Sequence, residues 1–225
     1  MNQTVHDCPL CGAPTSLYCT DRRRAYYHCT SCGLVHVPGP WHLDAQAERA
    51  IYDLHENDAN EPGYRRFLSR VAEPLLARLP PASEGLDFGC GPAPALAAML
   101  EEHGHCVALH DIYYHPAPEL LDRMWDFITA TEVVEHLAQP LRELDRLWDC
   151  LQPGGWLAIM TKRVRDQHAF RTWHYKNDLT HISFFSEQSF EWLAKRWSAE
   201  LAIVSADVVL LRKGLDEAGV SLARD

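Results

Sequence analysis

Two short cysteine motifs constrain the first 40 residues more strongly than any other feature of the sequence. Cys8 and Cys11 lie in CPLCG, and Cys29 and Cys32 lie in CTSCG, so both motifs follow a C-x-x-C-G pattern. A tight C-x-x-C turn directs two thiolates at one ion, and two such turns complete a tetrahedral site of four sulfurs. The sequence therefore predicts a zinc ribbon over residues 1–40, with AYYHC supplying a strand of its hairpin.

The predicted zinc has a structural role. Four thiolates leave no coordination position for water, so the ion would stabilise a segment too small to fold unaided rather than catalyse a reaction. Between the two motifs, Arg22, Arg23 and Arg24 precede Tyr26 and Tyr27. Arginines at a hairpin tip are usually solvated, and we favour that interpretation over a small nucleic-acid contact.

Composition and charge restrict the class of protein. A chain of 225 residues with 47% hydrophobic residues can bury a full core. The N-terminal sequence lacks the charged and apolar regions of a signal peptide, and no window approaches the roughly 20 apolar residues of a membrane span. We therefore expect a cytoplasmic protein with no membrane partner. The formal net charge of −10 disfavours indiscriminate binding to nucleic acid, because such binding needs concentrated Lys and Arg. The oligomeric state is not predictable.

Residues 41–82 are predicted to form a helical linker or lid. Residues 44–57 read as a short helix with Asp44 as a possible N-cap. In residues 62–79 the apolar side chains recur every three or four positions, which marks one buried stripe of a second helix.

Residues 83–213 have the pattern of an α/β fold, and residues 214–225 form a tail. Predicted strands alternate with amphipathic helices in GLDFG, PALAAMLEEHG, CVALHD, DFITATEVV, PLRELDRLWDCL, GWLAIMTK, SEQSFEWLAKRW and LAIVSADVVLLRK. This alternation predicts a Rossmann-like, mostly parallel sheet with helices on both faces, preceded by the small zinc ribbon and the helical linker. Ligands of such folds bind beyond the C-terminal ends of the strands.

A glycine turn in GLDFGCGPAPAL resembles the start of a nucleotide-binding turn. Gly89 and Gly91 are spaced as in the dinucleotide fingerprint G-x-G-x-x-G, but Pro94 occupies the position of the third glycine. Pro92 and Pro94 also remove two amide donors that a pyrophosphate would need. The expected ligand therefore lacks phosphates but still approaches the backbone closely at the two glycines.

Two aspartates near this turn suggest what that ligand is. Asp87, two residues before Gly89, suits a ligand that carries an ammonium group. Asp111 follows the next predicted strand, where it can accept hydrogen bonds from the two hydroxyls of a ribose. An ammonium group, a ribose and no phosphate together describe S-adenosylmethionine.

Residues 85–212 resemble the class I S-adenosylmethionine-dependent methyltransferases, in particular the branch that includes ubiquinone-biosynthesis-type enzymes. The motifs that carry this resemblance are LDFGCGPAPAL, ALHD, WDFITATEVVEHL, LQPGGWLAIMTK and YKNDLTHISFFS. The cysteine ribbon looks like the N-terminal zinc module of some bacterial methyltransferases, with related modules on some ribosomal-RNA guanine methyltransferases and deoxysugar C-methyltransferases. Two departures are Ala93 at the family's third glycine and a segment before Asp126 too short to identify an adenine contact.

The resemblance implies a set of cofactor contacts. The methionine end of the cofactor would lie near Gly89 to Gly91, its ribose at Asp111, and backbone contacts around Thr131 and Glu132. The expected cofactor-binding residues are Asp87, Gly89, Cys90, Gly91, Asp111, Ile112, Thr131 and Glu132.

Candidate catalytic residues lie in two segments. TEVVEH offers Glu132, Glu135 and His136 after a strand end. NDLTHISFF offers Asp178 and His181, and Asp178 is expected to orient the His181 ring. A general base is needed only when the acceptor must lose a proton. The alternative is structural: His136 helps to begin a helix, and His181 is a hydrogen-bonded core histidine. Both interpretations stay open at this point.

The favoured function is methyl transfer from S-adenosylmethionine to a small-molecule acceptor, with the ribbon and linker forming a structural lid. One alternative is an RNA methyltransferase that uses the ribbon to bind RNA. It is disfavoured because residues 1–40 contain only three arginines, against two aspartates. Another alternative is a non-catalytic cofactor-binding module. The sequence identifies neither the acceptor nor the atom methylated.

Overall fold

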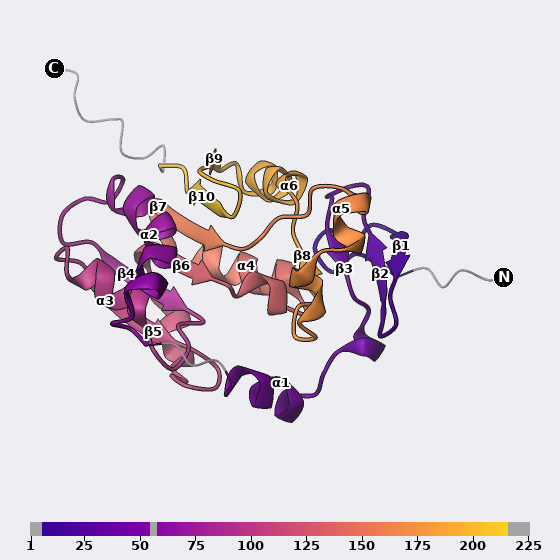
Figure 1. Cartoon of the computed structure of the whole chain (residues 1–225). Coiled ribbons are helices and arrows are strands. Elements are labelled where there is room, and N and C mark those ends of the chain that lie inside the picture. The colour runs from indigo at the N-terminus through magenta and orange to yellow at the C-terminus, as the bar shows by residue number, and fades with distance from the viewer. Residues whose placement is uncertain (1–5, 55–57, 216–225) are drawn as a thin grey trace, which may run out of the picture.

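The computed structural model describes residues 6–54 and 58–215, so residues 55–57 of the first predicted helix and 216–225 of the predicted tail lie outside it. The described residues form two sheets, with strand orders β1-β2-β3-β8 and β5-β4-β6-β7-β10-β9. The smaller sheet lies at one end of the molecule (Figure 1). Its strands are β1 (Ser16–Thr20), β2 (Ala25–His28), β3 (Val35–His36) and β8 (Ser183–Phe184).

The larger sheet is mostly parallel, as predicted. Its parallel strands are β4 (Glu84–Phe88), β5 (Cys106–His110), β6 (Trp125–Thr131) and β7 (Leu151–Met160). The last predicted strand forms two antiparallel strands instead, β9 (Glu200–Ile203) and β10 (Val208–Arg212). The chain reverses between them because Ser205 Oγ donates to Asp207 Oδ1 at 2.8 Å and Val204 N donates to Val208 O at 3.0 Å.

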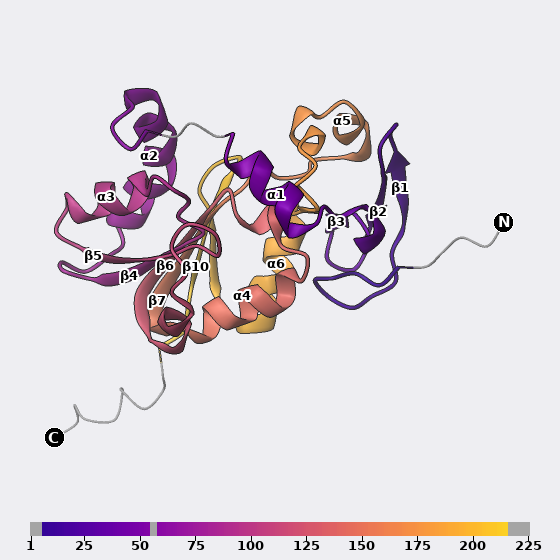
Figure 2. The same cartoon turned by 90° about the horizontal axis from the view of Figure 1, so that it is seen from below.

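Helices cover both faces of this sheet, which confirms the predicted fold class (Figure 2). One face packs against α2 (Pro62–Leu76) and α3 (Ala95–Glu101), and the other against α4 (Pro140–Asp149) and α6 (Glu187–Trp197). Side chains of β7 alternate accordingly: Leu157 and Ile159 pack on the α4 side, and Ala158 and Met160 on the α2 side. The parallel strands are therefore buried on both faces.

Helix ends follow local sequence signals. The helix α1 (Ala45–Tyr52) begins at Asp44, whose carboxylate accepts from Ala47 N at 2.8 Å. The helix α2 ends at Leu76, three residues before the predicted end, and Pro80 follows soon after, where it disfavours helical geometry at Leu79. In the part of the chain described, no helix combines the length and apolarity needed to span a bilayer. The short helices are α5 (Gln167–Arg171) and the 3₁₀ turns η1 (Gly39–Trp41), η2 (Pro118–Asp122), η3 (Val134–His136) and η4 (His174–Asn177).

The N-terminal sheet is continuous with a segment from the second half of the chain. The strand β3 pairs antiparallel with β8, with Val35 opposite Phe184. Arg24 is only 3% exposed and donates to the carbonyls of Lys176, Asp178 and Leu179 at 2.9, 2.8 and 3.0 Å. The expectation that all three arginines are solvated is therefore wrong for Arg24. Its guanidinium instead satisfies carbonyls of a loop that follows β7.

Candidate active site and cysteine centre

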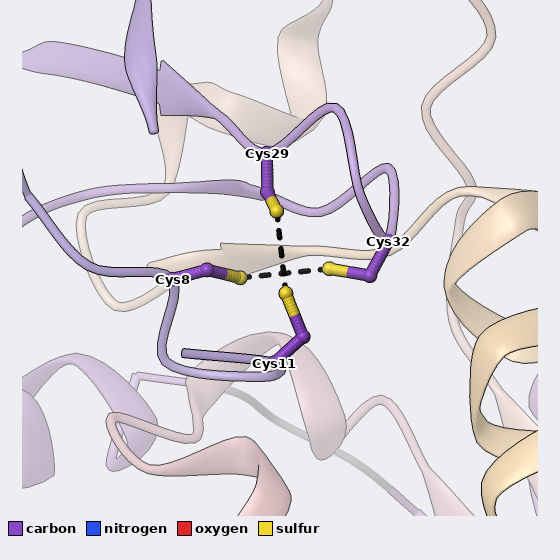
Figure 3. A group of neighbouring side chains, drawn as sticks. All are labelled: Cys8, Cys11, Cys29 and Cys32. Carbon is purple, nitrogen blue, oxygen red and sulfur yellow. Dashed lines mark hydrogen bonds between the residues drawn. The ribbon is translucent and has the colours of Figure 1, made fainter. Parts of the chain in front are cut away.

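Four thiols converge on one point in the N-terminal sheet, as Figure 3 shows. Cys8 Sγ lies 3.5 Å from Cys32 Sγ, and Cys11 Sγ lies 3.3 Å from Cys29 Sγ. A tetrahedral zinc site with bonds of about 2.3 Å separates its sulfurs by roughly 3.8 Å, so these thiols have nearly the spacing that zinc requires. The cluster is compatible with the predicted zinc ribbon.

Both cysteine turns have the same backbone geometry. Gly12 and Gly33 have φ angles of 72° and 71°, which glycine adopts without steric cost. Their amides donate to the carbonyls of Cys8 and Cys29 at 2.9 and 2.8 Å. Each turn therefore places the two cysteines of its motif on one side of the loop.

A cavity of about 650 Å³ lies at the C-terminal ends of β4, β5 and β6. It lies where a doubly wound sheet binds its ligands. Side chains from the helical linker also line it, namely Glu48 and Tyr52 of α1 and Tyr64 and Phe67 of α2. A lid formed by this linker was predicted, but these four residues were not identified in advance, because their positions depend on how the helices pack. Of the predicted site residues, the cavity is lined by Gly89, Cys90, Gly91, Asp111, Ile112, Thr131, Glu132, His136 and His181.

The glycine turn after β4 forms one wall of the cavity. Gly89 has a φ of 73°, and a Cβ there would lie 2.4 Å from Val133 Cγ2. Gly91 has a φ of 65°, and within the described residues no atom would lie within 4 Å of a Cβ there. Gly89 is thus required by packing and backbone geometry, whereas Gly91 presents open backbone to the cavity.

Asp111 connects this turn to the end of β5. Its Oδ2 accepts from Gly91 N at 3.1 Å, and its Oδ1 accepts from the amides of Tyr113 and Tyr114 at 2.8 and 3.0 Å. A carboxylate has about four lone-pair sites, so acceptor capacity remains for a ligand hydroxyl. Ile112, beside it, is 68% exposed at the edge of the cavity.

Asp87 is buried beneath the glycine turn. It is 4% exposed, its Oδ1 accepts from Thr129 Oγ1 at 2.6 Å, and it is absent from the described residues that line the cavity. Burial raises the pKa of Asp87 to about 6. Direct contact with a ligand ammonium group, as expected from the sequence, would need Asp87 to become accessible from the cavity.

Two glutamates after β6 share one tyrosine. The Tyr175 hydroxyl lies 3.2 Å from Glu132 Oε2 and also contacts Glu135 Oε1. Burial raises the pKa of Glu132 and of Glu135 to about 7, and the charge of Glu135 adds to the effect on Glu132. One hydroxyl carries one proton, so it can donate to only one carboxylate at a time. The second carboxyl is satisfied only if it is protonated or meets another cation or donor.

Three polar atoms, two of them in this pair of glutamates and one beside it, lack a hydrogen-bond partner in the described residues. Within residues 6–54 and 58–215, no hydrogen-bond partner reaches Thr131 Oγ1, Glu132 Oε1 or Glu135 Oε2, although all three atoms are buried. Glu132 also has a φ of 52°, which is unusual for a residue with a side chain. Unsatisfied polar atoms and a strained backbone at a strand end are typical of a ligand site.

His136 and His181 lie side by side, with ring centroids 4.8 Å apart. His181 Nδ1 lies 2.8 Å from Tyr175 O, to which it donates, so the proton is on Nδ1 and Nε2 has a free lone pair. Burial lowers the pKa of His181 to about 4 and also lowers that of His136. Asp178 Oδ2 is 3.8 Å from His181 Nε2, beyond a hydrogen bond. The Tyr175 carbonyl, rather than the expected Asp178, therefore orients the ring.

Glu135, His136 and His181 have the donor set of a metal site. One ligand atom from each lies within 4.8 Å of the other two. Two imidazoles and a carboxylate are a combination that first-row divalent cations accept. The cluster can therefore act either through a neutral imidazole that accepts a proton or through a bound cation.

A family model described as a methyltransferase domain matches residues 61–205, well over half of the chain. The chain belongs to this methyltransferase family. It is a class I S-adenosylmethionine-dependent methyltransferase, as the sequence motifs indicated. The cysteine ribbon lies outside the matched residues, and a search of curated proteins gives no match.

Solved structures share the fold of this methyltransferase at low sequence identity. The 1,6-didemethyltoxoflavin-N1-methyltransferase of Burkholderia thailandensis, solved with 1,6-didemethyltoxoflavin and S-adenosylhomocysteine, is 17% identical with a TM-score of 0.50, over 86% of this chain and 97% of that one. An S-adenosylmethionine-dependent methyltransferase of Archaeoglobus fulgidus is 13% identical with a TM-score of 0.53, over 66% of this chain and 94% of that one. An O-methyltransferase family protein of Burkholderia thailandensis is 15% identical with a TM-score of 0.53, over 79% of this chain and 62% of that one.

Proposed function

We propose that this methyltransferase transfers the methyl group of S-adenosylmethionine to a small molecule held in the 650 Å³ cavity. The observation that carries the proposal is the composition of that cavity. It combines an open glycine turn and a carboxylate, suited to the cofactor, with Glu132, His136 and His181, suited to an acceptor. The sulfonium methyl is intrinsically electrophilic, so the protein mainly aligns the acceptor and excludes water.

The cofactor residues are the cavity-lining members of the predicted set. Gly91 lets the methionine end approach the backbone, and Asp111 accepts from a ribose hydroxyl with its remaining lone pair. The unpartnered Thr131 Oγ1 is available for a polar group of the cofactor. Asp87 acts from below, because its Thr129 bond fixes the strand end from which the turn starts.

Contacts of the linker helix favour a small acceptor. The Tyr113 hydroxyl donates to Glu48 Oε2 at 2.7 Å, and the Tyr114 hydroxyl donates to Asp53 Oδ1 at 2.7 Å, so α1 is tied across the cavity mouth as a lid. RNA remains the weaker alternative, since Arg24 is committed to loop carbonyls and the chain has a net charge of −10. The bound 1,6-didemethyltoxoflavin of the Burkholderia thailandensis enzyme is in keeping with a small acceptor.

The histidine pair and Glu132 provide the proton chemistry. His181 Nε2 is unprotonated at neutral pH because burial lowers its pKa to about 4, so its lone pair can accept a hydrogen bond from an acceptor hydroxyl or amine. Glu132, whose pKa burial raises to about 7, is the stronger base of the predicted catalytic set. A divalent cation on Glu135, His136 and His181 is a second arrangement, favoured by the unpartnered Glu135 Oε2. When bound, such a cation polarises an acceptor oxygen. Methyl transfer is measured before and after chelator treatment, and the zinc that stays bound is quantified to check the cysteine cluster. Loss of transfer with the zinc retained would favour the cation, and unchanged transfer would favour the metal-free arrangement.

The cysteine cluster holds a structural zinc ion in this proposal. Its four sulfurs complete a tetrahedral site and leave no position for a substrate. In this proposal, the ribbon and linker together form a structural unit over residues 1–82, and residues 83–213 form the methyltransferase domain. The family match begins at residue 61 and so includes α2, which this division assigns to the linker.

The test is calorimetric titration with S-adenosylmethionine, followed by methyl transfer from cofactor labelled at the methyl group. We expect micromolar binding of S-adenosylmethionine, no binding of NAD, and label transferred to low-mass metabolites rather than to RNA. Methyl label incorporated into RNA would favour the RNA methyltransferase alternative. Cofactor binding without transfer to either pool would favour a non-catalytic module.

A further inference from the structure

A second cavity, of about 580 Å³, lies beside the first and has a different composition. It is enclosed by the segment after β7, by α5, and by residues at the start of β10. Its chemically distinctive lining residues are Arg70, Lys162, Arg163, Arg165, Phe170 and Trp173. Four cations and two aromatic rings therefore surround one hollow in a protein whose net charge is −10.

Two carboxylates, Asp207 and Glu187, also line this cavity and offset half of the formal charge of its four cations. Asp207, also in the lining, pairs with Arg70 and accepts from Ser205 Oγ at 2.8 Å. Within the part of the chain that the structure describes, Arg163 and Arg165 form no ion pair with any carboxylate. Their positive charge therefore remains available to an anion from outside.

Arg163 has one edge of its guanidinium fixed and the other free. Its Nη2 donates to Ser205 O at 2.7 Å. Its Nη1 is buried, and among residues 6–54 and 58–215 it has no hydrogen-bond partner. A buried guanidinium nitrogen without an acceptor is uncommon, and a carboxylate or phosphate oxygen is the acceptor that fits it best.

Lys162 lines both cavities, so the two share a wall. Its Nζ lies 3.2 Å from His174 Nε2 and 5.3 Å from the centre of the Tyr175 ring, which lines the first cavity. The two cavities are therefore adjacent at Lys162, and an acceptor that occupies both must extend past this side chain to Arg163. This geometry connects the anion-binding groups with the place proposed for methyl transfer.

We propose that the second cavity binds an anionic group of the methyl acceptor, a carboxylate or a phosphate, while the reactive end of the acceptor lies in the first cavity. The inference rests on the proposed function for the identity of the ligand as acceptor. Arg163 supplies the free hydrogen-bond edge, Arg165 and Lys162 add charge, and Trp173 and Phe170 offer an apolar wall. The protein thus selects acidic acceptors despite its own negative charge.

The test uses phenyl phosphate and benzoate as probes, titrated separately into the full chain with its zinc and with S-adenosylhomocysteine bound. The two probes distinguish a phosphate from a carboxylate, and phenol controls for the ring alone. We expect one anion to bind and Arg163→Ala to weaken it by about tenfold or more. Arg165→Ala, at an exposed position that does not endanger folding, should weaken it less. Arg171→Ala, on α5 but outside the cavity lining, should leave it unchanged.

Two results would overturn the inference: neither anion binds, or Arg163→Ala and Arg165→Ala both bind it as well as the wild type does. The affinity for S-adenosylhomocysteine is measured in the same samples. If that affinity is normal while the anions fail, the second cavity is not an acceptor subsite and the proposed methyl transfer stands. If S-adenosylhomocysteine itself fails to bind, the proposed function is at fault instead.

Discussion

The cysteine centre and the strand-end cavity are both built on glycines with positive φ, but they treat polar groups in opposite ways. In the cysteine centre, the four thiols point at one another in an arrangement compatible with a tetrahedral zinc site. At the cavity, Thr131 Oγ1 and Glu132 Oε1 of its lining and Glu135 Oε2 behind the lining are buried without a partner in the described residues. The comparison teaches that a closed donor set stabilises a fold, whereas unsatisfied donors and acceptors mark the place for a ligand.

The two regions are nevertheless connected through one segment. Arg24 holds the carbonyls of Lys176, Asp178 and Leu179, and Ile182 bridges the two sides of the connection. Ile182 N donates to Glu135 O at 2.8 Å, while Ile182 O accepts from Val37 N at 2.8 Å. The ribbon therefore supports the segment that carries His181, and its loss should reach the active site.

The largest expected effect comes from opening the closed site. Cys29→Ser removes one of four ligands, and zinc binding contributes on the order of 10 kcal/mol to the folding of small zinc modules. We expect loss of zinc, a lower melting temperature and loss of methyl transfer, measured by metal analysis, calorimetry and the labelling assay. Cys106→Ser, at an exposed cysteine outside the cluster, is the control. A folded, metal-free and active Cys29→Ser variant would show that the centre is dispensable.

The next effect sharpens the comparison from the other side, because it should alter cofactor binding while leaving the cysteine centre intact. Asp111→Ala removes a charged acceptor from the cavity, and hydrogen bonds to charged groups contribute about 1.5–3 kcal/mol. We expect S-adenosylmethionine affinity to fall by roughly 10- to 100-fold by titration calorimetry. Zinc content should not change. Exposed Asp149→Ala is the matched control, and unchanged affinity in Asp111→Ala would refute the ribose assignment.

How much was predictable follows from sequence distance. The cysteine turns, Gly89 and Asp111 were found because each depends on residues close in sequence and on strand ends that periodicity reveals. The β3–β8 pairing, the Arg24 contacts and the Tyr175–Glu135 contact join residues far apart in the chain, and no local pattern encodes such pairing. The role expected for Asp178 depends on local side-chain geometry instead: its Oδ1 accepts from Thr180 N at 2.9 Å, and its Oδ2 lies 3.8 Å from His181 Nε2, too far for a hydrogen bond.

A smaller effect tests the connection between the two regions. Arg24→Lys keeps the charge but loses the guanidinium fork, so buried carbonyls are left unpaired at a cost of about 1–3 kcal/mol. We expect a lower urea midpoint with zinc retained, and methyl transfer reduced because the segment before His181 loosens. Arg22→Lys, exposed on the same hairpin, should behave as the wild type does. Lower stability with full activity would mean that the ribbon stabilises the fold without positioning the active site.

The smallest effect is a pH dependence that belongs to the cavity alone. Burial raises the pKa of Glu135 from 4.5 to about 7, so between these values the folded state binds more protons than the unfolded state. Stability from Glu135 is therefore complete below pH about 4.5 and is lost as the pH rises towards 7. His181, whose pKa is lowered to about 4, acts in the opposite sense between pH 4 and 6.5.

The difference between wild type and Glu135→Gln reports on the glutamate pair, because the charge of Glu135 also raises the pKa of Glu132. Melting temperatures of the two proteins should diverge between pH 5 and 8, with Glu135→Gln gaining relative to wild type as the pH rises. If the melting temperatures of wild type and Glu135→Gln change with pH in parallel, the charge of Glu135 is neutralised by a bound cation or is solvated. If the two profiles diverge only after chelator treatment, a bound cation is the cause.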